Sequence, residues 1–105
     1  MDNLEQKDRR CEKVIKEAAA QFFARTLPSQ ALVTVTGCHL DNHGSEATVF
    51  ISVLPDTAMD TVLKDAQRLR SDLREYLRAA TKLPIIPRVD VLPAPRETEE
   101  EVEKI

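Results

Sequence analysis

Hydrophobic and polar residues follow a helical period at the start of the chain. Across residues 4–25 apolar side chains recur every three or four positions, which is the spacing of one helix face. The residues on this face are Cys11, Val14, Ile15, Ala18, Ala19 and Phe22. We expect the face to pack against a sheet. The predicted helix ends at Leu27-Pro28, because a residue that precedes proline is pushed out of the helical region.

The pattern changes to that of two strands between residues 32 and 54. The first, at 32–40, combines β-branched apolar residues with threonines, which is typical of a half-buried strand. Gly37 interrupts its alternation, and a β-bulge there would keep the apolar residues before and after it on one face. A polar turn at 41–45 leads to the second strand, at 47–54, which is apolar at nearly every position. Such a run predicts a central strand with cover on both faces, or with its outer face buried by a partner.

A longer helix is predicted from a cap at Asp56 or Thr57 to about Lys82. Its apolar stripe consists of Val62, Ala66, Leu69, Leu73, Leu77 and Ala80. The other side carries the basic residues Lys64, Arg68, Arg70, Arg74, Arg78 and Lys82. Three of these arginines, at 70, 74 and 78, are four positions apart and form one row free to meet a polyanion. The same helix holds Asp60, Asp65, Asp72 and Glu75, which favour local ion pairs, so a phosphate-binding surface and a solvated charged face both remain open.

A short third strand is predicted at residues 88–92, between Pro87 and Pro93. Proline cannot donate a ladder hydrogen bond, so this strand should lie at an edge of the sheet. The second strand, the long helix and the third strand make a β-α-β unit, whose two strands run parallel. The prediction is one α+β domain over residues 1–96, with element order α-β-β-α-β, followed by an acidic tail at 97–105.

Length, composition and charge fit a small globular protein. The chain has 105 residues, of which 42% are hydrophobic and 31% are charged, and this balance allows one packed core. Its net charge is -3, but the tail alone holds five glutamates and one lysine, so the rest is close to neutral. No apolar run reaches the roughly 20 residues that a bilayer requires, and the start lacks a signal-peptide pattern. We therefore expect a cytoplasmic protein without membrane contact, whose two cysteines stay reduced.

Several segments, taken together and in order, resemble bacterial ribosome-binding factor A. They are LVTVTGCHL at 32–40, EATVFISVL at 46–54, LRSDL at 69–73 and the Leu83-Pro84 pair before the last strand. The resemblance implies a type II KH-like fold with a three-stranded mixed sheet, helices on one face, and a helix-kink-helix in place of the long helix. It also implies a role in maturation of the small ribosomal subunit, through contact with its ribosomal RNA, that supports growth in the cold.

Two features of the chain bear on these implications. Family members mark the kink with Ala-x-Gly, whereas the matching positions here are Asp65, Ala66 and Gln67. Without the glycine we expect the helix to run straighter, so a kinked and a straight helix both remain open. Like the family, the chain lacks the GXXG loop with which ordinary KH domains hold a nucleic-acid backbone, so RNA contact would depend on basic side chains.

Catalytic and metal-binding interpretations are disfavoured by the same sequence. His39, Asp41 and His43 lie close together but lack a fourth ligand, so we expect a polar turn rather than a metal site. Cys38 and His39 are neighbours on a strand and point to opposite faces, which excludes them as a nucleophile and its base. The prediction is a protein that is not an enzyme and has no cofactor and no small-molecule substrate.

The predicted function is that of a ribosome assembly factor, acting as a monomer, whose partner is the small ribosomal subunit and its ribosomal RNA. The candidate RNA-binding residues are Lys13, Arg25, Lys64, Arg68, Arg70, Arg74, Arg78, Lys82 and Arg88. Recognition would be of RNA shape, because the chain offers few aromatic side chains for base stacking. The alternative is a protein-protein interaction module that docks a partner through the exposed side of its sheet, without direct RNA contact.

Overall fold

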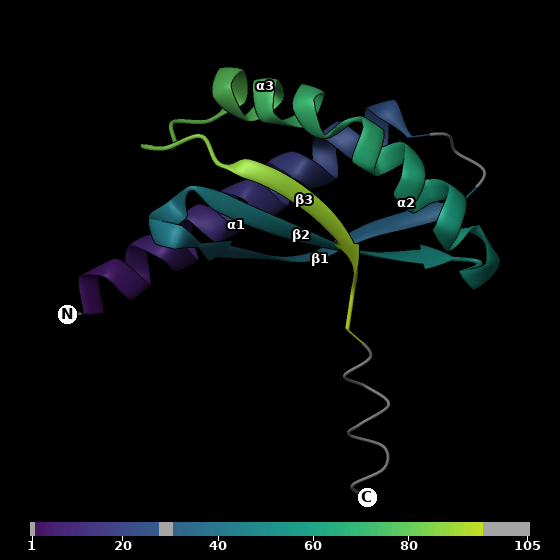
Figure 1. Ribbon diagram of the computed structural model, residues 1–105, viewed down its shortest axis with the longest axis horizontal. Coiled ribbons are helices and arrows are strands. Elements are labelled where there is room, and N and C mark those ends of the chain that lie inside the picture. Colours follow the sequence, from purple (N-terminus) through teal and green to yellow (C-terminus); the bar gives the residue numbers. More distant parts are fainter. Residues whose placement is uncertain (1, 28–30, 96–105) are drawn as a thin grey trace, which may run out of the picture.

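The computed structural model describes residues 2–27 and 31–95, and the predicted tail at 97–105 lies outside this range. Its elements are α1 (Asp2–Thr26), β1 (Leu32–Asp41), the 3-10 helix η1 (Asn42–Gly44), β2 (Glu46–Leu54), the 3-10 helix η2 (Asp56–Ala58), α2 (Met59–Arg68), α3 (Arg70–Ala80) and β3 (Arg88–Pro93). The sheet has the order β1-β2-β3, with β1 antiparallel and β3 parallel to β2 (Figure 1). These findings confirm the predicted α+β class, the element order and the edge position of the last strand.

A β-bulge lies where the sequence predicted it. The pairing of β1 with β2 shifts by one residue between Val35 and Gly37. Val35 before the shift and Leu40 after it are both buried, so the bulge keeps them on the same face. Because of the bulge, the same side of β1 faces the core before and after Gly37.

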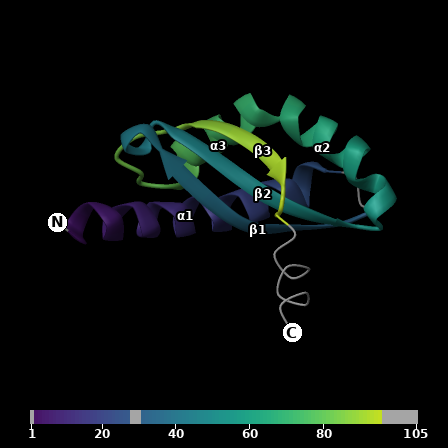
Figure 2. The ribbon, with the colours of Figure 1, turned by 60° about the horizontal axis from the view of Figure 1, so that its bottom comes forward.

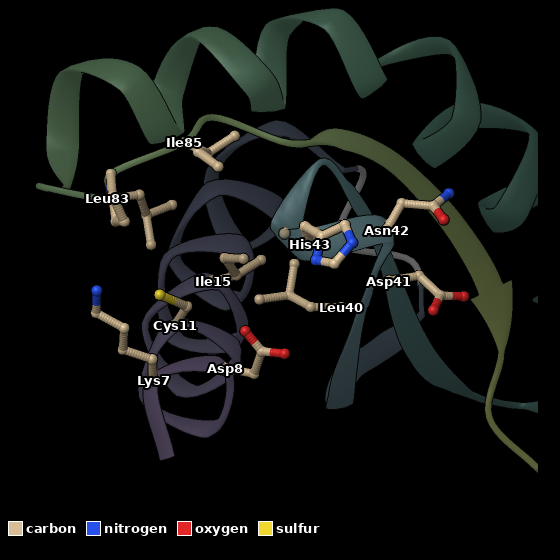
Figure 3. Close-up of a pocket in the computed structure, with 12 residues that line it drawn as sticks. Lys7, Asp8, Cys11, Ile15, Leu40, Asp41, Asn42, His43, Leu83 and Ile85 are labelled. Atoms are coloured by element: carbon tan, nitrogen blue, oxygen red, sulfur yellow. The ribbon is translucent and has the colours of Figure 1, made fainter. Parts of the chain in front are cut away.

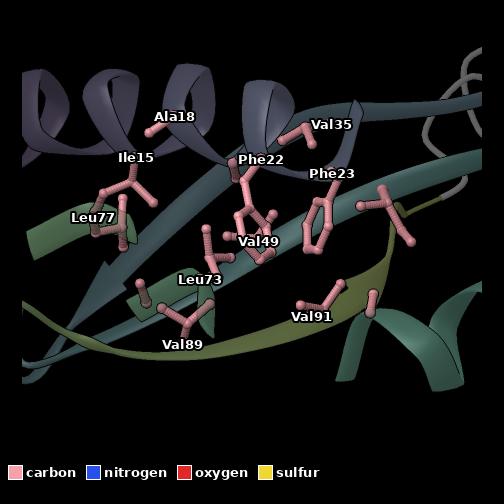
Figure 4. Packing of buried hydrophobic residues seen from close by; sticks show 14 of the residues in the cluster. Ile15, Ala18, Phe22, Phe23, Val35, Val49, Leu73, Leu77, Val89 and Val91 are labelled. Carbon is pink, nitrogen blue, oxygen red and sulfur yellow. The ribbon is translucent and has the colours of Figure 1, made fainter. Parts of the chain in front are cut away.

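The core lies between the inner face of the sheet and the three α-helices. Four alternate residues of β2, at 47, 49, 51 and 53, are buried, together with Val89 and Val91 of β3. Ile15, Phe22, Leu73 and Leu77 pack against them from the helices (Figure 4). Figure 2 shows the strands in front of α1 and α3, so the helices share one side of the sheet.

The outer face of the sheet bears on the two arrangements predicted for β2. Its residues there are half-buried or exposed, and Leu54 at its end is 60% exposed. Within the described residues β2 is thus central but covered on one face only, so cover of its outer face could come only from a partner, which is the other arrangement predicted for this strand. Two residues of the predicted apolar faces, Val14 and Ala80, are exposed and do not belong to the core.

The long helix is broken at Leu69, which separates α2 from α3. Leu69 has φ -91° and ψ 9°, and its N–H is shared between the carbonyls of Asp65 and Ala66, at 3.2 and 3.1 Å. Any L-residue can adopt this conformation, so no glycine is required for the break. Of the two alternatives left open by the sequence, the structure has the interrupted helix, not the straight one. The helix also ends earlier than predicted, at Ala80, so Lys82 lies in the following loop.

Candidate nucleic-acid interface

The predicted arginine row lies where α3 packs beside β3 and the loop before it. Arg74, in the middle of the row, donates through Nε to the carbonyl of Pro87 at 3.2 Å. Its Nη2 donates to the carbonyl of Ile86 at 3.3 Å. The guanidinium is thus bound to the backbone of the chain itself.

The outer edge of β3 explains this position of Arg74. The N–H of Arg88 donates to the carbonyl of Ser45, the residue before β2, at 2.9 Å, and the N–H of Ala94 donates to the carbonyl of Ile51 in β2 at 2.7 Å. By alternation, the odd-numbered residues of β3 direct their backbone groups away from the sheet. Pro87 and Pro93 occupy odd-numbered positions of this kind. Proline has no backbone N–H, so neither residue adds an unpaired donor to the edge.

Side chains bind other backbone groups of this edge. The N–H of Val91 donates to the Asp90 carboxylate at 2.9 Å, and its carbonyl accepts from the Gln67 amide at 3.2 Å. Arg74 does the same for the carbonyl of Pro87. Since an open strand edge can pair with another chain, these contacts protect the edge. Arg74 is therefore a structural residue of the junction between α3 and β3.

The arginines on either side of Arg74 have carboxylates beside them. Arg70 lies 3.4 Å from Asp90, and its Nε also donates to the carbonyl of Gln67 at 2.9 Å. Arg78 lies 3.4 Å from Glu75, one turn away on α3.

On α2, Arg68 pairs with Asp65, and its side chain remains 71% exposed. The expectation of a row of free guanidinium groups is therefore wrong. Exposed ion pairs of this kind are worth only about 0–1 kcal/mol, however, so Arg68, Arg70 and Arg78 can exchange a carboxylate for a phosphate.

The other candidate residues are not gathered on one surface. Lys13 belongs to α1 beside the bulge of β1, at the opposite edge of the sheet from α2. Arg25 lies over the ring of Tyr76, with 5.9 Å between its guanidinium carbon and the ring centroid. Lys64 is exposed on α2, Lys82 is exposed in the loop that follows α3, and Arg88 is exposed at the first position of β3. Four candidate cations, Lys64, Arg68, Arg70 and Arg78, thus lie together on the consecutive helices α2 and α3.

The edge of β1 is held by a carboxylate from α1. Glu12 accepts a hydrogen bond from the N–H of Leu40 at 2.8 Å, and it lies 3.8 Å from the His39 imidazole. Burial raises the pKa of the neighbouring Cys38 thiol to about 12, and the negative charge of Glu12 adds to the shift. The thiol is therefore protonated at neutral pH. In the part of the chain that the structure describes, no group of three His, Cys, Asp or Glu residues could hold a metal ion.

The structure also has a cavity at one end of the molecule that was not predicted from the sequence. It has a volume of about 370 Å³ and lies between α1, the turn at 42–44 and the loop at 83–85 (Figure 3). The run of apolar residues from Leu83 to Ile86, interrupted only by proline, was the signal in the sequence for such a wall.

Comparisons connect this chain to other proteins through its fold. A scan against models of protein families and a search of curated proteins found no match. Among solved structures, the crystal structure of ribosome-binding factor A from Thermus thermophilus aligns with a TM-score of 0.73 at 22% identity, covering 82% of this chain and 94% of that chain. The fold is that of ribosome-binding factor A.

A second structure agrees with this assignment. The solution NMR structure of a Thermotoga maritima protein, described as a candidate ribosome-binding factor A, aligns with a TM-score of 0.57 at 21% identity. It covers 81% of this chain and 80% of that chain. The KH-like architecture implied by the resemblance is confirmed. Among the described helices, none is long and apolar enough to cross a membrane.

Proposed function

We propose that this protein is a ribosome assembly factor that binds small-subunit ribosomal RNA and aids maturation of the small ribosomal subunit. The observation that carries the proposal is the likeness in fold to ribosome-binding factor A, which extends over 94% of the Thermus protein. We take residues 1–96 as one KH-like domain that acts in the cytoplasm, as a monomer and without catalysis.

Binding is proposed to depend on the exposed cations of α2 and α3. Lys64, Arg68, Arg70 and Arg78 are all exposed, and they lie on two consecutive helices on the same side of the sheet. Arg74 is left out of the proposed contact set because its guanidinium supports the backbone before β3. The chain lacks a GXXG loop, so phosphate contact would come from these side chains.

Sedimentation of the tagged protein with ribosomal particles tests the proposal. We expect the protein to travel with free small subunits and to be depleted from whole ribosomes, since an assembly factor acts before the subunits join. Equal association with both, or with neither, would contradict the proposal.

The salt dependence of binding to small-subunit RNA tests the proposed contacts. Four phosphate contacts predict a slope of about -3 for log affinity against log salt concentration. The double variant Arg68→Gln/Arg78→Gln should make the slope less steep by about 1.5. Arg9→Gln/Lys16→Gln on α1 removes the same charge elsewhere and should change the slope little. A slope near zero for the unaltered protein would exclude the electrostatic mechanism.

A second candidate function is that of a protein-protein interaction module. It is favoured by the outer face of the sheet, on which the paired residues Leu32 and Leu54 are 64% and 60% exposed. Phe50 and its neighbour Leu92 lie on the same face and are partly exposed. A complex recovered from lysate that survives nuclease and high salt would favour this function over RNA binding.

A further inference from the structure

The cavity between α1, the turn at 42–44 and the loop at 83–85 has apolar walls and a polar rim. Its floor is made by Ile15 and Leu40, which are 1% and 7% exposed. Ile85 forms part of the wall and is 49% exposed, although it is a large apolar residue. A volume of about 370 Å³ falls at the lower end of the range of about 300–1,000 Å³ typical of small-molecule sites. An occupant of modest size would bury apolar surface here.

The turn that closes this cavity has an uncommon backbone. Asn42, His43 and Gly44 follow one another with positive φ angles of 51°, 58° and 86°. Such conformations are uncommon outside glycine and often occur at functional sites. The turn places the exposed His43 in the lining, beside Leu40 (Figure 3). An imidazole in this position offers a flat surface on which a planar ligand can stack.

The polar groups of the rim restrict the kind of ligand. Asp8 and Asp41 both line the cavity, and an ionised carboxylate only accepts hydrogen bonds. A ligand that fits must therefore be planar and must donate hydrogen bonds. A nucleobase and the guanidinium of an arginine both meet this description.

The cations around the cavity decide between these two ligands. Lys7 is part of the lining, and the exposed Lys82 directly precedes the wall residue Leu83. Arg88 lies next to the turn, because its N–H donates to the carbonyl of Ser45 at 2.9 Å. These three cations outnumber the carboxylates of Asp8 and Asp41, so the charge around the cavity favours the phosphates on either side of a base over a cationic peptide.

We propose that this cavity binds one unpaired base of RNA, with guanine preferred. The base stacks on His43 against the apolar wall, and its N1–H and amino group donate to the two oxygens of the Asp8 carboxylate. Uracil offers one N–H donor on the same edge and binds less tightly. The inference rests on the proposed RNA-binding function and assigns it a site for a single base, separate from the cations of α2 and α3.

Affinities for single-stranded oligonucleotides test this site on the full chain. A uridine hexamer with one central guanosine should bind more tightly than the hexamer of uridine alone. His43→Asn removes the ring but keeps a residue that tolerates the left-handed turn. It should weaken binding of the guanosine hexamer about tenfold and abolish the difference between the two. His39→Asn makes the same change on an exposed histidine outside the cavity and should leave both affinities unaltered.

Amide NMR shifts separate the failure of this site from the failure of the proposed function. Guanosine monophosphate should shift the amides of residues 42–44 and 83–85 more than uridine monophosphate does. Shifts confined to α2 and α3 would overturn the base site and leave RNA binding intact. If neither the nucleotides nor RNA shift any amide, both the base site and the proposed RNA-binding function are overturned. A response of residues 42–44 to acetyl-arginine amide alone would identify a peptide site and also overturn the proposal.

Discussion

Arg74 shows that the position of an arginine in a helical row does not determine what its guanidinium binds. It shares the spacing of Arg70 and Arg78, yet its two hydrogen bonds go to the carbonyls of Ile86 and Pro87. Those carbonyls belong to a loop twelve and thirteen residues away in sequence, and helical projection does not reveal such a contact. The sequence identified the cation correctly, but the fold determines what it binds.

The two contacts of Arg74 predict a stability effect that its neighbour in the row lacks. Arg74→Ala leaves two part-buried carbonyls without their charged donor, which should lower the free energy of unfolding by about 1–3 kcal/mol. Arg78→Ala removes only an exposed ion pair and should cost less than about 0.5 kcal/mol. Urea denaturation of both variants measures the difference. Equal losses would contradict the structural role of Arg74.

The Cys38 thiol predicts a loss of stability at alkaline pH. Burial and the charge of Glu12 raise its folded-state pKa from 9.0 to about 12, so the folded state disfavours the thiolate. The unfolded chain releases this proton first, and stability therefore declines as the pH rises above 9.0 towards 12. Cys38→Val removes the titrating group.

Comparison of the two proteins across this pH range measures the effect of the thiol. Between pH of about 8 and about 10.5, the unaltered protein should lose on the order of 1–2 kcal/mol of unfolding free energy relative to Cys38→Val. Parallel curves for the two proteins would show that the thiol does not contribute.

Among the elements, the broken helix shows which local features the sequence can predict. The strands, the bulge at Gly37 and the edge position of β3 follow from alternation, glycine and proline, which act within a few residues. The break at Leu69 carries no such local signal, since a residue with ordinary φ and ψ makes it. Packing of Val62 and Ala66 on one side and Leu73 and Leu77 on the other fixes two separate helical segments on one core.

The break at Leu69 predicts that a glycine at position 67 is not needed and would be harmful. Gln67 lies within α2 and donates to the carbonyl of Val91 on the edge of β3. Gln67→Gly removes this bond and adds backbone entropy to the unfolded chain, so it should cost about 2 kcal/mol. Gln67→Ala removes the bond alone and should cost about 1 kcal/mol. Thermal or urea unfolding measures both, and a stabilising effect of glycine would refute this account of the break.

In the whole molecule, the balance of charge on the α2 and α3 side limits any affinity for a polyanion. Asp65, Glu75 and Asp90 each hold one of the exposed arginines, and the chain carries a net charge of -3. A phosphate must displace these carboxylates before it can bind. The acids therefore compete with phosphate for the guanidinium groups, and they should limit the affinity of the proposed contact with RNA.

Removal of these competitors should strengthen RNA binding. In the triple variant Asp65→Asn/Glu75→Gln/Asp90→Asn each acid becomes an amide of similar shape, and the new amide oxygen at position 90 can still accept from the N–H of Val91. We expect the affinity for small-subunit RNA to rise about tenfold at low salt, with a steeper salt dependence. Filter binding over a salt series measures both quantities.

A second triple variant controls for net charge. Glu17→Gln/Glu46→Gln/Asp56→Asn removes the same charge from exposed acids of α1, β2 and η2 that do not pair with Arg68, Arg70 or Arg78. An equal gain in this variant would mean that total charge, rather than release of specific guanidinium groups, governs binding. If neither variant gains affinity, the RNA contact lies elsewhere on the molecule. Neutralising the acids beside Arg68, Arg70 and Arg78 would then have freed cations that RNA does not touch.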